Sequence, residues 1–280
     1  MKLTICKQGY EHKEFGKNCQ DVVESGMVYV DTKEDRKLCK YAIVCDGCGS
    51  TLYSEIGARL FIEHFKRNTN YIPDVVMYEE APYNIAAHLN WVMDTFLGWL
   101  NEELEWSIIP EYASFSLLFM LDTGNTIYVV TMGDGYVYSK INGELEIISL
   151  DPPIENTPLY PLYMYLPEDM MTVYKHSDVH WNHFVFTKSD EDYEECLDMD
   201  YHVRKISPGD IVGIATDGIR FALEPSVHFP QYEVDAFKEA LGSKLVRVSR
   251  MINKYPKNFK DDVGIAMMEV AGEENENGNI

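Results

Sequence analysis

In Tyr41-Ala42-Ile43-Val44-Cys45-Asp46-Gly47-Cys48-Gly49-Ser50, an apolar run ends at a carboxylate and two glycines. Ile43 and Val44 suit a strand that is packed on both faces, and the glycines allow a tight turn directly after it. Asp46 would then stand where the sheet opens to solvent. Because an Asp-Gly pair is also a common surface turn, this stretch alone does not distinguish a site from a turn.

The same pattern recurs along the chain. Two further apolar runs end in an Asp-Gly pair, at Asp217-Gly218 and at Asp134-Gly135. A fourth acid position, Asp261-Asp262, stands directly before the apolar run 263–270. Repeated delivery of an acid by a strand predicts that these side chains converge at one edge of a sheet.

Converging carboxylates need a positive partner, because each close pair repels by about 1 to 4 kcal/mol at about 4 Å. Bases are few nearby: Arg220 follows Asp217 and Lys260 precedes Asp261. Hard divalent cations take oxygen ligands, and an all-carboxylate set without a His-Cys cluster favours Mg²⁺ or Mn²⁺ over Zn²⁺. Two such ions, bridged by one carboxylate, would polarise a phosphoryl group and ionise a bound water near neutral pH.

Composition narrows the possible partners. The chain has 280 residues, 46% of them hydrophobic, and a formal net charge of -22. This charge argues against nucleic acid and against an anionic membrane surface, and it favours cationic ligands. No apolar run approaches the roughly 18 to 20 residues of a membrane span, and no signal-peptide pattern is present. We therefore expect a cytoplasmic protein whose six cysteines are thiols.

Hydrophobic periodicity predicts an α+β fold. Helices are predicted after Ser50, after Pro82 and across 232–253. The segment 9–21 is polar and predicted to be a loop. Antiparallel strands, four of them in one central meander, are expected to form two packed sheets with helices outside. The predicted strands are 4–7, 27–30, 41–45, 114–121, 126–132, 136–141, 145–149, 263–270 and one that ends at Asp217.

Two segments lack clean periodicity. Residues from about 151 to 205 contain many prolines and tyrosines and an acidic patch at 190–195. An irregular stretch of that length is usually functional or mobile, so we interpret it as a flap-like insertion. The polar tail 272–280 is predicted to be disordered.

Five short motifs follow one another between about Gly9 and Val270: Cys19-Gln20-Asp21, Asp46-Gly47-Cys48-Gly49, Val130-Thr131-Met132-Gly133-Asp134, Ala215-Thr216-Asp217-Gly218 and Asp261-Asp262-Val263-Gly264-Ile265-Ala266. In order and spacing they resemble the motifs of the type 2C metal-dependent Ser/Thr protein phosphatases, the PPM family. The Cys-Gln-Asp motif resembles that of a bacterial subgroup, where other members have Asn-Gln-Asp.

The resemblance implies a fold and a domain organisation. Family members are four-layer α/β/β/α sandwiches, in which two antiparallel sheets are packed face to face and flanked by helix pairs. On this basis residues 1–271 are expected to form a single phosphatase domain, with the insertion at about 151–205 beside the active site and the tail 272–280 outside the domain.

The resemblance also implies a two-metal centre for Mn²⁺ or Mg²⁺, with room for a third, weaker ion at Asp134 and Asp217. A metal-bound hydroxide would attack phosphorus in line, and Asp46 and Asp217 would be the catalytic acids. The implied metal ligands are Asp21, Asp46, the Gly47 carbonyl, Asp134, Asp217 and Asp261.

Three positions depart from the family pattern. No arginine precedes Asp21 to bind the phosphate, so His12, Lys13 or Lys17 is expected to substitute. Cys48 stands where some relatives have a histidine that is proposed to protonate the leaving alcohol, which favours a metal-bound water for that role. Asp262 replaces a frequent asparagine; the family register favours Asp261 as the ligand, and the residues alone leave the choice open.

Other metal or redox sites were weighed. Cys45 and Cys48 match the Cys-x-x-Cys pattern of a redox pair or half a zinc site, but no second pair exists. His176, His180 and His183 could share a face only on a helix, while their neighbours are typical of a strand.

The resulting hypothesis is a metal-dependent phosphatase that acts on phosphoserine and phosphothreonine in proteins. The alternative is a catalytically weak or inactive relative that binds phosphoproteins or regulators. A two-metal nuclease would fit the acids but not the negative charge of the chain.

Overall fold

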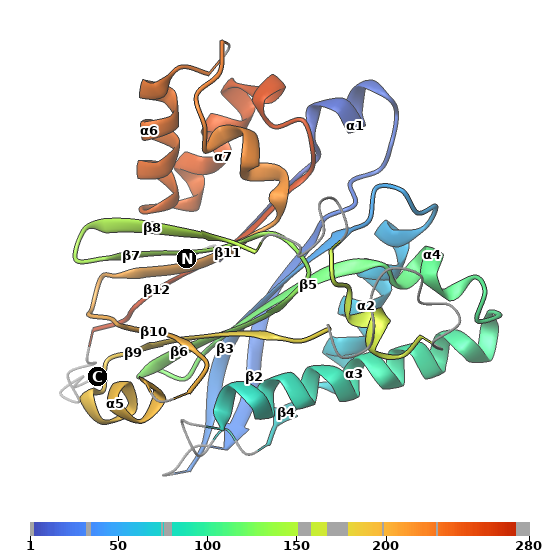
Figure 1. The fold of residues 1–280 in the computed structure, drawn as a ribbon, viewed down its shortest axis with the longest axis horizontal. Helices are drawn as coiled ribbons and strands as arrows, with labels where there is room; N and C mark the ends of the chain where they lie inside the picture. The colour runs from blue at the N-terminus through green and yellow to red at the C-terminus, as the bar shows by residue number, and fades with distance from the viewer. Residues whose placement is uncertain are drawn as a thin grey trace, which may run out of the picture.

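The computed structural model describes residues 3–31, 35–73, 75, 80–150, 158–166, 179–197, 199–227 and 229–272. These residues form two β-sheets that lie against one another (Figure 1). The five-stranded sheet has the order β1 (Thr4–Lys7), β12 (Val263–Glu269), β11 (Ile211–Ala215), β7 (Tyr136–Ile141) and β8 (Glu144–Ser149). The seven-stranded sheet has the order β10 (His202–Lys205), β9 (Asn182–Thr187), β6 (Thr126–Met132), β5 (Phe115–Asp122), β3 (Arg36–Gly47), β2 (Val22–Asp31) and β4 (Tyr71–Ile72).

Helices cover the outer face of each sheet. Helices α2 (Ser54–Asn68) and α3 (Ala81–Glu103) lie on the seven-stranded sheet, and α6 (Gln231–Leu241) and α7 (Leu245–Lys254) lie on the five-stranded sheet (Figure 1). The described residues also form α1 (Tyr10–Glu14), α4 (Ile109–Ala113), α5 (Asp190–Leu197) and the 3-10 helices η1 (Pro161–Met164), η4 (Asp217–Ala222) and η5 (Pro256–Asn258). None of the described helices is long and apolar enough to cross a membrane.

Strand β3 shows why the sheets stack in this way. Successive side chains of a strand point to opposite faces. Ile43 therefore packs in the cluster beneath α2 and α3, whereas Ala42 and Val44 pack between the two sheets, with Ile214 of the five-stranded sheet. All of these side chains are fully buried, so both faces of β3 are covered. The predicted α+β sandwich is confirmed.

Two edge pairs differ from the predicted antiparallel arrangement. Strand β4 pairs with β2 in parallel, and β10 pairs with β9 in parallel. Helix α5 separates β9 from β10, and a helical crossover of this kind lets the returning strand run in the same direction as its partner. Strand β4 reaches β2 only after both β3 and α2.

The predicted central meander is divided between the two sheets. Strands β5 and β6 pair in the seven-stranded sheet, and β7 and β8 pair in the five-stranded sheet. The chain crosses between sheets at Gly133-Asp134-Gly135, where both glycines have positive φ, 104° and 128°. The left-handed region favours glycine, and these two residues give the connection its sharp change of direction.

Two other predictions of regular structure were incomplete. The helix predicted across 232–253 is interrupted, since α6 ends before Gly242 and α7 begins at Leu245. The segment 9–21, predicted to be a loop, contains the short helix α1.

The prediction of an irregular segment is wrong for part of 151–205, because β9, α5 and β10 lie within it. Strand β9 pairs with β6, and the Thr126 hydroxyl donates to Thr187 Oγ1 across 2.9 Å. This strand extends the sheet and is an integral part of the sandwich. Residues 151–157, 167–178 and 198, and the tail beyond residue 272, lie outside the described residues.

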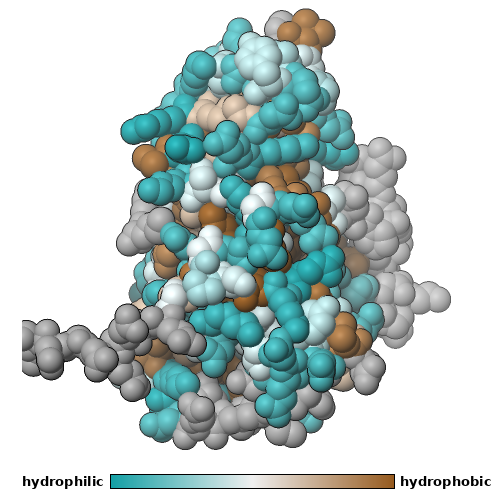
Figure 2. Space-filling model, turned by 90° about the vertical axis from the view of Figure 1, so that its left-hand side faces the viewer, coloured by the Kyte–Doolittle hydropathy of each residue, from teal (hydrophilic) through white to brown (hydrophobic). Residues whose placement is uncertain are grey.

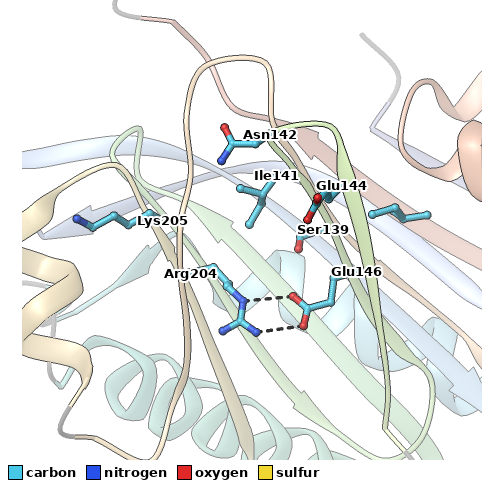
Figure 3. A pocket seen from close by; sticks show the side chains of 8 residues that line it. Ser139, Ile141, Asn142, Glu144, Glu146, Arg204 and Lys205 are labelled. Atoms are coloured by element: carbon cyan, nitrogen blue, oxygen red, sulfur yellow. Dashed lines mark hydrogen bonds and ion pairs between the residues drawn. The ribbon is translucent and has the colours of Figure 1, made fainter.

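The end of the sandwich where β7 turns into β8 presents a mostly hydrophilic surface (Figure 2). A hollow of about 500 Å³ lies there between the hairpin and β10. Arg204 lines it and is paired with Glu146 through two contacts, of 3.3 and 3.1 Å (Figure 3). Its charge is therefore already balanced. Asp134 precedes β7, so the acid-bearing turns lie at the other end of the strands.

Candidate metal centre

Four acid-bearing turns lie at one end of the two sheets. Asp46 is the penultimate residue of β3, and Asp134 lies in the turn from β6 to β7. Asp217 begins η4, two residues after β11, and Asp261-Asp262 directly precede β12. Because β11 and β12 are antiparallel, with Ala215 opposite Ile265, the end of one and the start of the other lie together.

Asp46 is the centre of this acid cluster. The carboxyl group of Asp46 interacts with those of both Asp21 and Asp217. Burial is the first cause that raises the pKa of Asp46 well above its usual range, followed by the charges of Asp21, Asp217, Asp134 and Asp261. Five acids that are far apart in sequence therefore act on one another here.

The acid cluster is short of positive charge. Burial is also the main cause that raises the pKa of Asp21 and of Asp134. Burial and the charges of Asp134 and Asp261 raise the pKa of Asp217 to about 7, and the nearby Arg220 offsets this only in part. Mg²⁺ and Mn²⁺ bind oxygen ligands, and carboxylates in particular. The buried carboxylates of this cluster have too little positive charge nearby to balance them, so they fit such ions.

Hydroxyl groups position two of the acids. Thr216 donates to Asp21 Oδ2 and accepts from the amide of Gly264. Ser116, opposite Asp46 in the β3–β5 register, donates to Asp134 Oδ1 and accepts from the amide of Asp134 across 3.2 Å. Both hydroxyls link an acid to the backbone of the sheets, which limits how far that acid can move.

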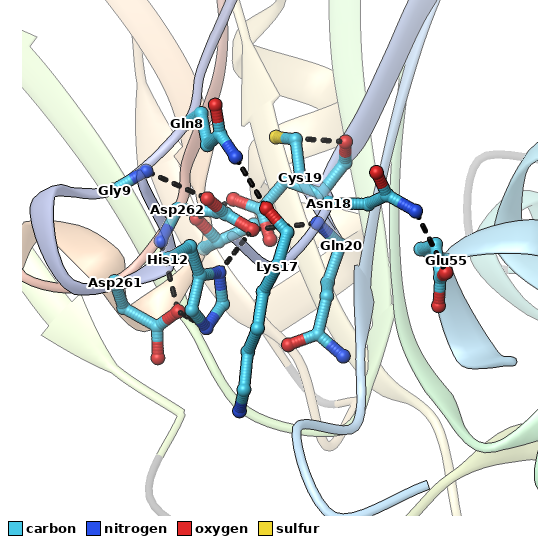
Figure 4. A network of polar contacts seen from close by, with 12 residues as sticks. Gln8, Gly9, His12, Lys17, Asn18, Cys19, Gln20, Glu55, Asp261 and Asp262 are labelled. Carbon is cyan, nitrogen blue, oxygen red and sulfur yellow. Dashed lines mark hydrogen bonds and ion pairs between the residues drawn. The ribbon is translucent and has the colours of Figure 1, made fainter. Parts of the chain in front are cut away.

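Asp261 and Asp262 have different environments (Figure 4). Asp262 is 1% exposed, and its carboxylate accepts from the amides of Gly9 and Gln20, each across 2.6 Å, and contacts His12 Nδ1 at 2.8 Å. Asp262 thus anchors the N-terminal segment. The Asp261 side chain is 54% exposed, and its charge acts on Asp46 and Asp217. These contacts favour Asp261 as the residue that faces an ion.

Two of the three residues predicted to bind phosphate, His12 and Lys13, lie on α1, and they differ in their surroundings. His12 is buried and directs both ring nitrogens at acids, Nδ1 to Asp262 and Nε2 to Asp261 Oδ1 at 3.5 Å. Ligand atoms of His12, Asp261 and Asp262 all lie within 4.8 Å of one another, which also makes this trio a possible cation site. Lys13 is exposed on α1, and Lys17 extends its side chain from the following loop (Figure 4).

Gly47 and Cys48 form a tightly bonded turn. The Cys48 amide donates to the carbonyl of Ser114 across 3.0 Å, and the Cys48 carbonyl accepts from the hydroxyl of Ser54 across 2.9 Å. A side chain on Gly47 would meet the Ser54 hydroxyl at 2.9 Å, so the turn needs glycine there. Tyr160 lies at the same place, where burial raises the pKa of its hydroxyl and Cys48 adds to that effect.

Glycines on both sides hold the turn of Asp261 and Asp262. A Cβ atom on Gly218 would lie 1.7 Å from the carbonyl oxygen of Asp262, and one on Gly9 would lie 2.3 Å from the carbonyl carbon of Asp261. Backbone from η4 and from the start of α1 therefore packs directly against the turn. The Asp-Gly pattern at Asp217-Gly218 was visible in the sequence, but this contact was not.

Sequence reasoning missed four residues of the site: Ser116, Thr216, Tyr160 and Gly9. Thr216 stands next to Asp217 inside a recognised motif, so its position was a usable signal. Ser116 and Tyr160 carry no local pattern that separates them from ordinary core or loop residues, because their role depends on which segments the fold brings to the acids.

The described residues do not assemble the other sites considered from the sequence. Cys45 is fully buried in the cluster beneath α2 and α3, while the Cys48 thiol contacts Ser50. His183 packs against the rings of Tyr83 and Tyr201, and burial lowers its pKa to about 4. His176 lies outside the described residues.

A family comparison agrees with the fold. The model of the protein phosphatase 2C family matches residues 8–248, and the chain belongs to this family. The resemblance read from the five motifs is confirmed, while the assignment to a Cys-Gln-Asp subgroup stays a prediction. No curated protein sequence matches the chain.

Solved structures share the fold. The serine/threonine phosphatase Stp1 from Staphylococcus aureus matches with a TM-score of 0.56 and 13% identity, over 97% of this chain and 96% of that one. The Mycobacterium tuberculosis phosphatase PstP/Ppp matches with a TM-score of 0.53 and 15% identity, over 96% and 97%. The catalytic domain of PstP in complex with two manganese ions matches with a TM-score of 0.54 and 16% identity, over 96% and 97%.

Proposed function

We propose that this chain is a metal-dependent protein phosphatase that hydrolyses phosphoserine and phosphothreonine monoesters. The observation that carries the proposal is that four other acids act on Asp46. Asp46, Asp21, Asp134 and Asp217 are each buried, and burial raises the pKa of each. Such a cluster costs stability unless cations occupy it, so a binding module would have no reason to keep it.

The proposed ligands are Asp21, Asp46, the Gly47 carbonyl, Asp134, Asp217 and Asp261. The proposed ions are two Mn²⁺ or Mg²⁺, with a third at Asp134 and Asp217. When bound, they would neutralise charge on the phosphoryl group and lower the pKa of a bound water. Asp46 interacts with both Asp21 and Asp217, and on this proposal it would be a ligand shared by the two main ions. Thr216 and Ser116 would hold Asp21 and Asp134 in place while substrate enters.

The chain's own basic residues would orient the phosphate. His12 is held by Asp262 at the edge of the acid cluster, and Lys13 and Lys17 lie on the same exposed segment. We propose these residues in place of the arginine of the family pattern. Tyr160, which lies beside Cys48, would contact the phosphorylated protein substrate.

The test is hydrolysis of para-nitrophenyl phosphate and of a phosphothreonine peptide, with Mn²⁺, with Mg²⁺ and with chelator. Asp46→Asn and Asp217→Asn should each lower kcat at least about 100-fold. Asp235→Asn is the matched control, because Asp235 is exposed on α6 and bonds only locally to Gln231 as far as the described contacts show. Activity that survives both chelator and the two substitutions would refute the metal mechanism, and inactivity with every metal would favour the phosphoprotein-binding alternative.

A further inference from the structure

Two free thiols lie beside the acid cluster. Cys6 is on β1 and Cys19 is on the loop before β2, and their Sγ atoms are 3.6 Å apart. Both thiols also approach the backbone carbonyl oxygen of Asp21, Cys6 at 3.3 Å and Cys19 at 3.6 Å. The thiol pair therefore contacts the backbone of Asp21 itself.

The thiol pair spans the two sheets. Cys6 lies opposite Gly264 of β12 in the five-stranded sheet, and Asp21 directly precedes β2 of the seven-stranded sheet. The segment that carries Cys19 is fixed from other sides, because Arg59 donates to the Cys19 carbonyl across 3.1 Å and the Gln20 amide donates to Asp262. Any covalent link between the two sulfurs would join the sheets at the edge of the metal centre.

We propose that Cys6 and Cys19 form a reversible regulatory disulfide, which weakens divalent-metal binding at Asp21 when peroxide oxidises the protein. Disulfide-bonded sulfurs lie about 2.05 Å apart, so the pair must close by only about 1.5 Å. Cys6 is exposed and Cys19 is partly buried, which makes Cys6 the thiol that an oxidant reaches first.

The chemistry balances with hydrogen peroxide as the oxidant. The Cys6 thiol loses its proton, and the thiolate attacks one peroxide oxygen, which breaks the O–O bond and leaves a sulfenic acid on Cys6. The departing hydroxide takes up the proton that the thiol lost and becomes one water. The Cys19 thiol then attacks that sulfur and expels the hydroxyl group as a second water. The two sulfurs lose two electrons, peroxide gains them, and a dithiol such as dithiothreitol reverses the reaction by becoming a disulfide itself.

The effect on metal binding follows from the contacts. Oxidation removes both S–H groups from the Asp21 carbonyl and draws the Cys19 segment and β1 together. The Asp21 carboxylate, which is held by Thr216, must then shift relative to Asp46. We expect the affinity for Mn²⁺ to fall at least about 10-fold, as is usual when the support of a ligand is disturbed.

Peptide mapping tests the bond itself. Trypsin separates the two cysteines into the peptides 3–7 and 18–33, each of which contains a single cysteine. Peroxide treatment of the full chain should give these two peptides as one linked species that dithiothreitol separates, and Cys6→Ser should abolish it. Oxidation at Cys48 alone, with no linked species, would overturn the proposal.

Calorimetric titration with MnCl₂ tests the consequence without an activity assay. Oxidised wild type should bind Mn²⁺ at least about 10-fold more weakly than reduced wild type, whereas Cys6→Ser should bind equally before and after peroxide. Cys48→Ser is the control and should keep the difference. A linked species with unchanged Mn²⁺ affinity would overturn the regulatory role.

The proposal extends the proposed function, because it assigns regulation to the same metal centre. Its failure can be told apart from failure of that function. A reduced protein that binds Mn²⁺ and loses affinity on oxidation, but hydrolyses no phosphoester, would keep the disulfide switch and reject the phosphatase. An active phosphatase whose activity and Mn²⁺ affinity do not change with peroxide would keep the phosphatase and reject the disulfide switch.

Discussion

Thr216 donates its hydroxyl proton to Oδ2 of Asp21 across 2.7 Å, although 195 positions separate the two residues. The same oxygen of Thr216 accepts from the Gly264 amide across 3.0 Å. One fully buried hydroxyl thus connects the end of β11, the start of β12 and the start of β2. The position of Asp21 in the site depends on this connection.

We expect Thr216→Val to lower both stability and metal affinity. Valine keeps the shape of threonine but leaves the Gly264 amide and Asp21 without a partner, which should lower the free energy of unfolding by about 1 to 3 kcal/mol. Urea unfolding and calorimetric titration with MnCl₂ measure the two effects. Thr216→Ser retains the hydroxyl and is the control. If Thr216→Ser lowered stability and Mn²⁺ affinity as much as Thr216→Val, then packing of the side chain and not its hydrogen bonds would be the cause.

The two adjacent acids should respond oppositely to substitution. Asp262→Asn places an amide group among the donors of Gly9, Gln20 and His12, so the free energy of unfolding should fall by about 1 to 3 kcal/mol. Asp261→Asn should change stability by less than about 0.5 kcal/mol, because its side chain is half exposed, yet it should abolish most of the phosphatase activity. Urea unfolding and Mn²⁺-dependent hydrolysis check this pair. The reverse pattern would assign the ligand role to Asp262.

The stability of the protein in chelator should fall as pH rises from about 5 to 7.5. Asp217 has a pKa of about 7 in the folded protein against 3.8 ordinarily, so between these values the folded state holds a proton that the unfolded state has lost. Each such carboxylate lowers the free energy of unfolding by about 1.4 kcal/mol per pH unit. Asp21 and Asp46, whose pKa values are also raised, act in the same direction.

Thermal unfolding at several pH values, with and without MnCl₂, measures this dependence. Saturating Mn²⁺ replaces the protons, so the rise in Tm that it causes should be larger at pH 7.5 than at pH 5.5. The double variant with Asp46→Asn and Asp217→Asn should flatten the profile in chelator. Stability that increases with pH in chelator would contradict the raised pKa values.

Gly218→Ala should distort the metal centre through the backbone. Its Cβ would lie 1.7 Å from the Asp262 carbonyl oxygen, so the turn that carries Asp261 must move, at a cost of about 1 to 3 kcal/mol. Gly98→Ala on α3 is the matched control, because a Cβ there meets nothing within 4 Å and should stabilise the helix by about 0.5 to 1 kcal/mol. Calorimetric titration with MnCl₂ and urea unfolding compare the two variants; equal Mn²⁺ affinity in both would refute the role of Gly218.

Local patterns determined much of this protein. The continuous apolar run before Asp46 was enough to predict a doubly covered strand, and Asp-Gly pairs marked the turns that carry the acids. These features depend on neighbours in the chain: side-chain period, glycine at a sharp turn, and helix periodicity in α2 and α3. They were sufficient to predict the sandwich and which acids to examine.

Only the tertiary structure decided how distant segments meet. Asp262 is an anchor and Asp261 faces the cluster because Gly9 and Gln20, about 250 positions away, supply the amides that one of the two carboxylates must accept. The pairing of Cys6 with Cys19 gave no sequence signal, since their contact arises from β1 joining β12 while the next segment enters the other sheet. Contacts of this kind depend on packing between the sheets, which no local pattern of residues encodes.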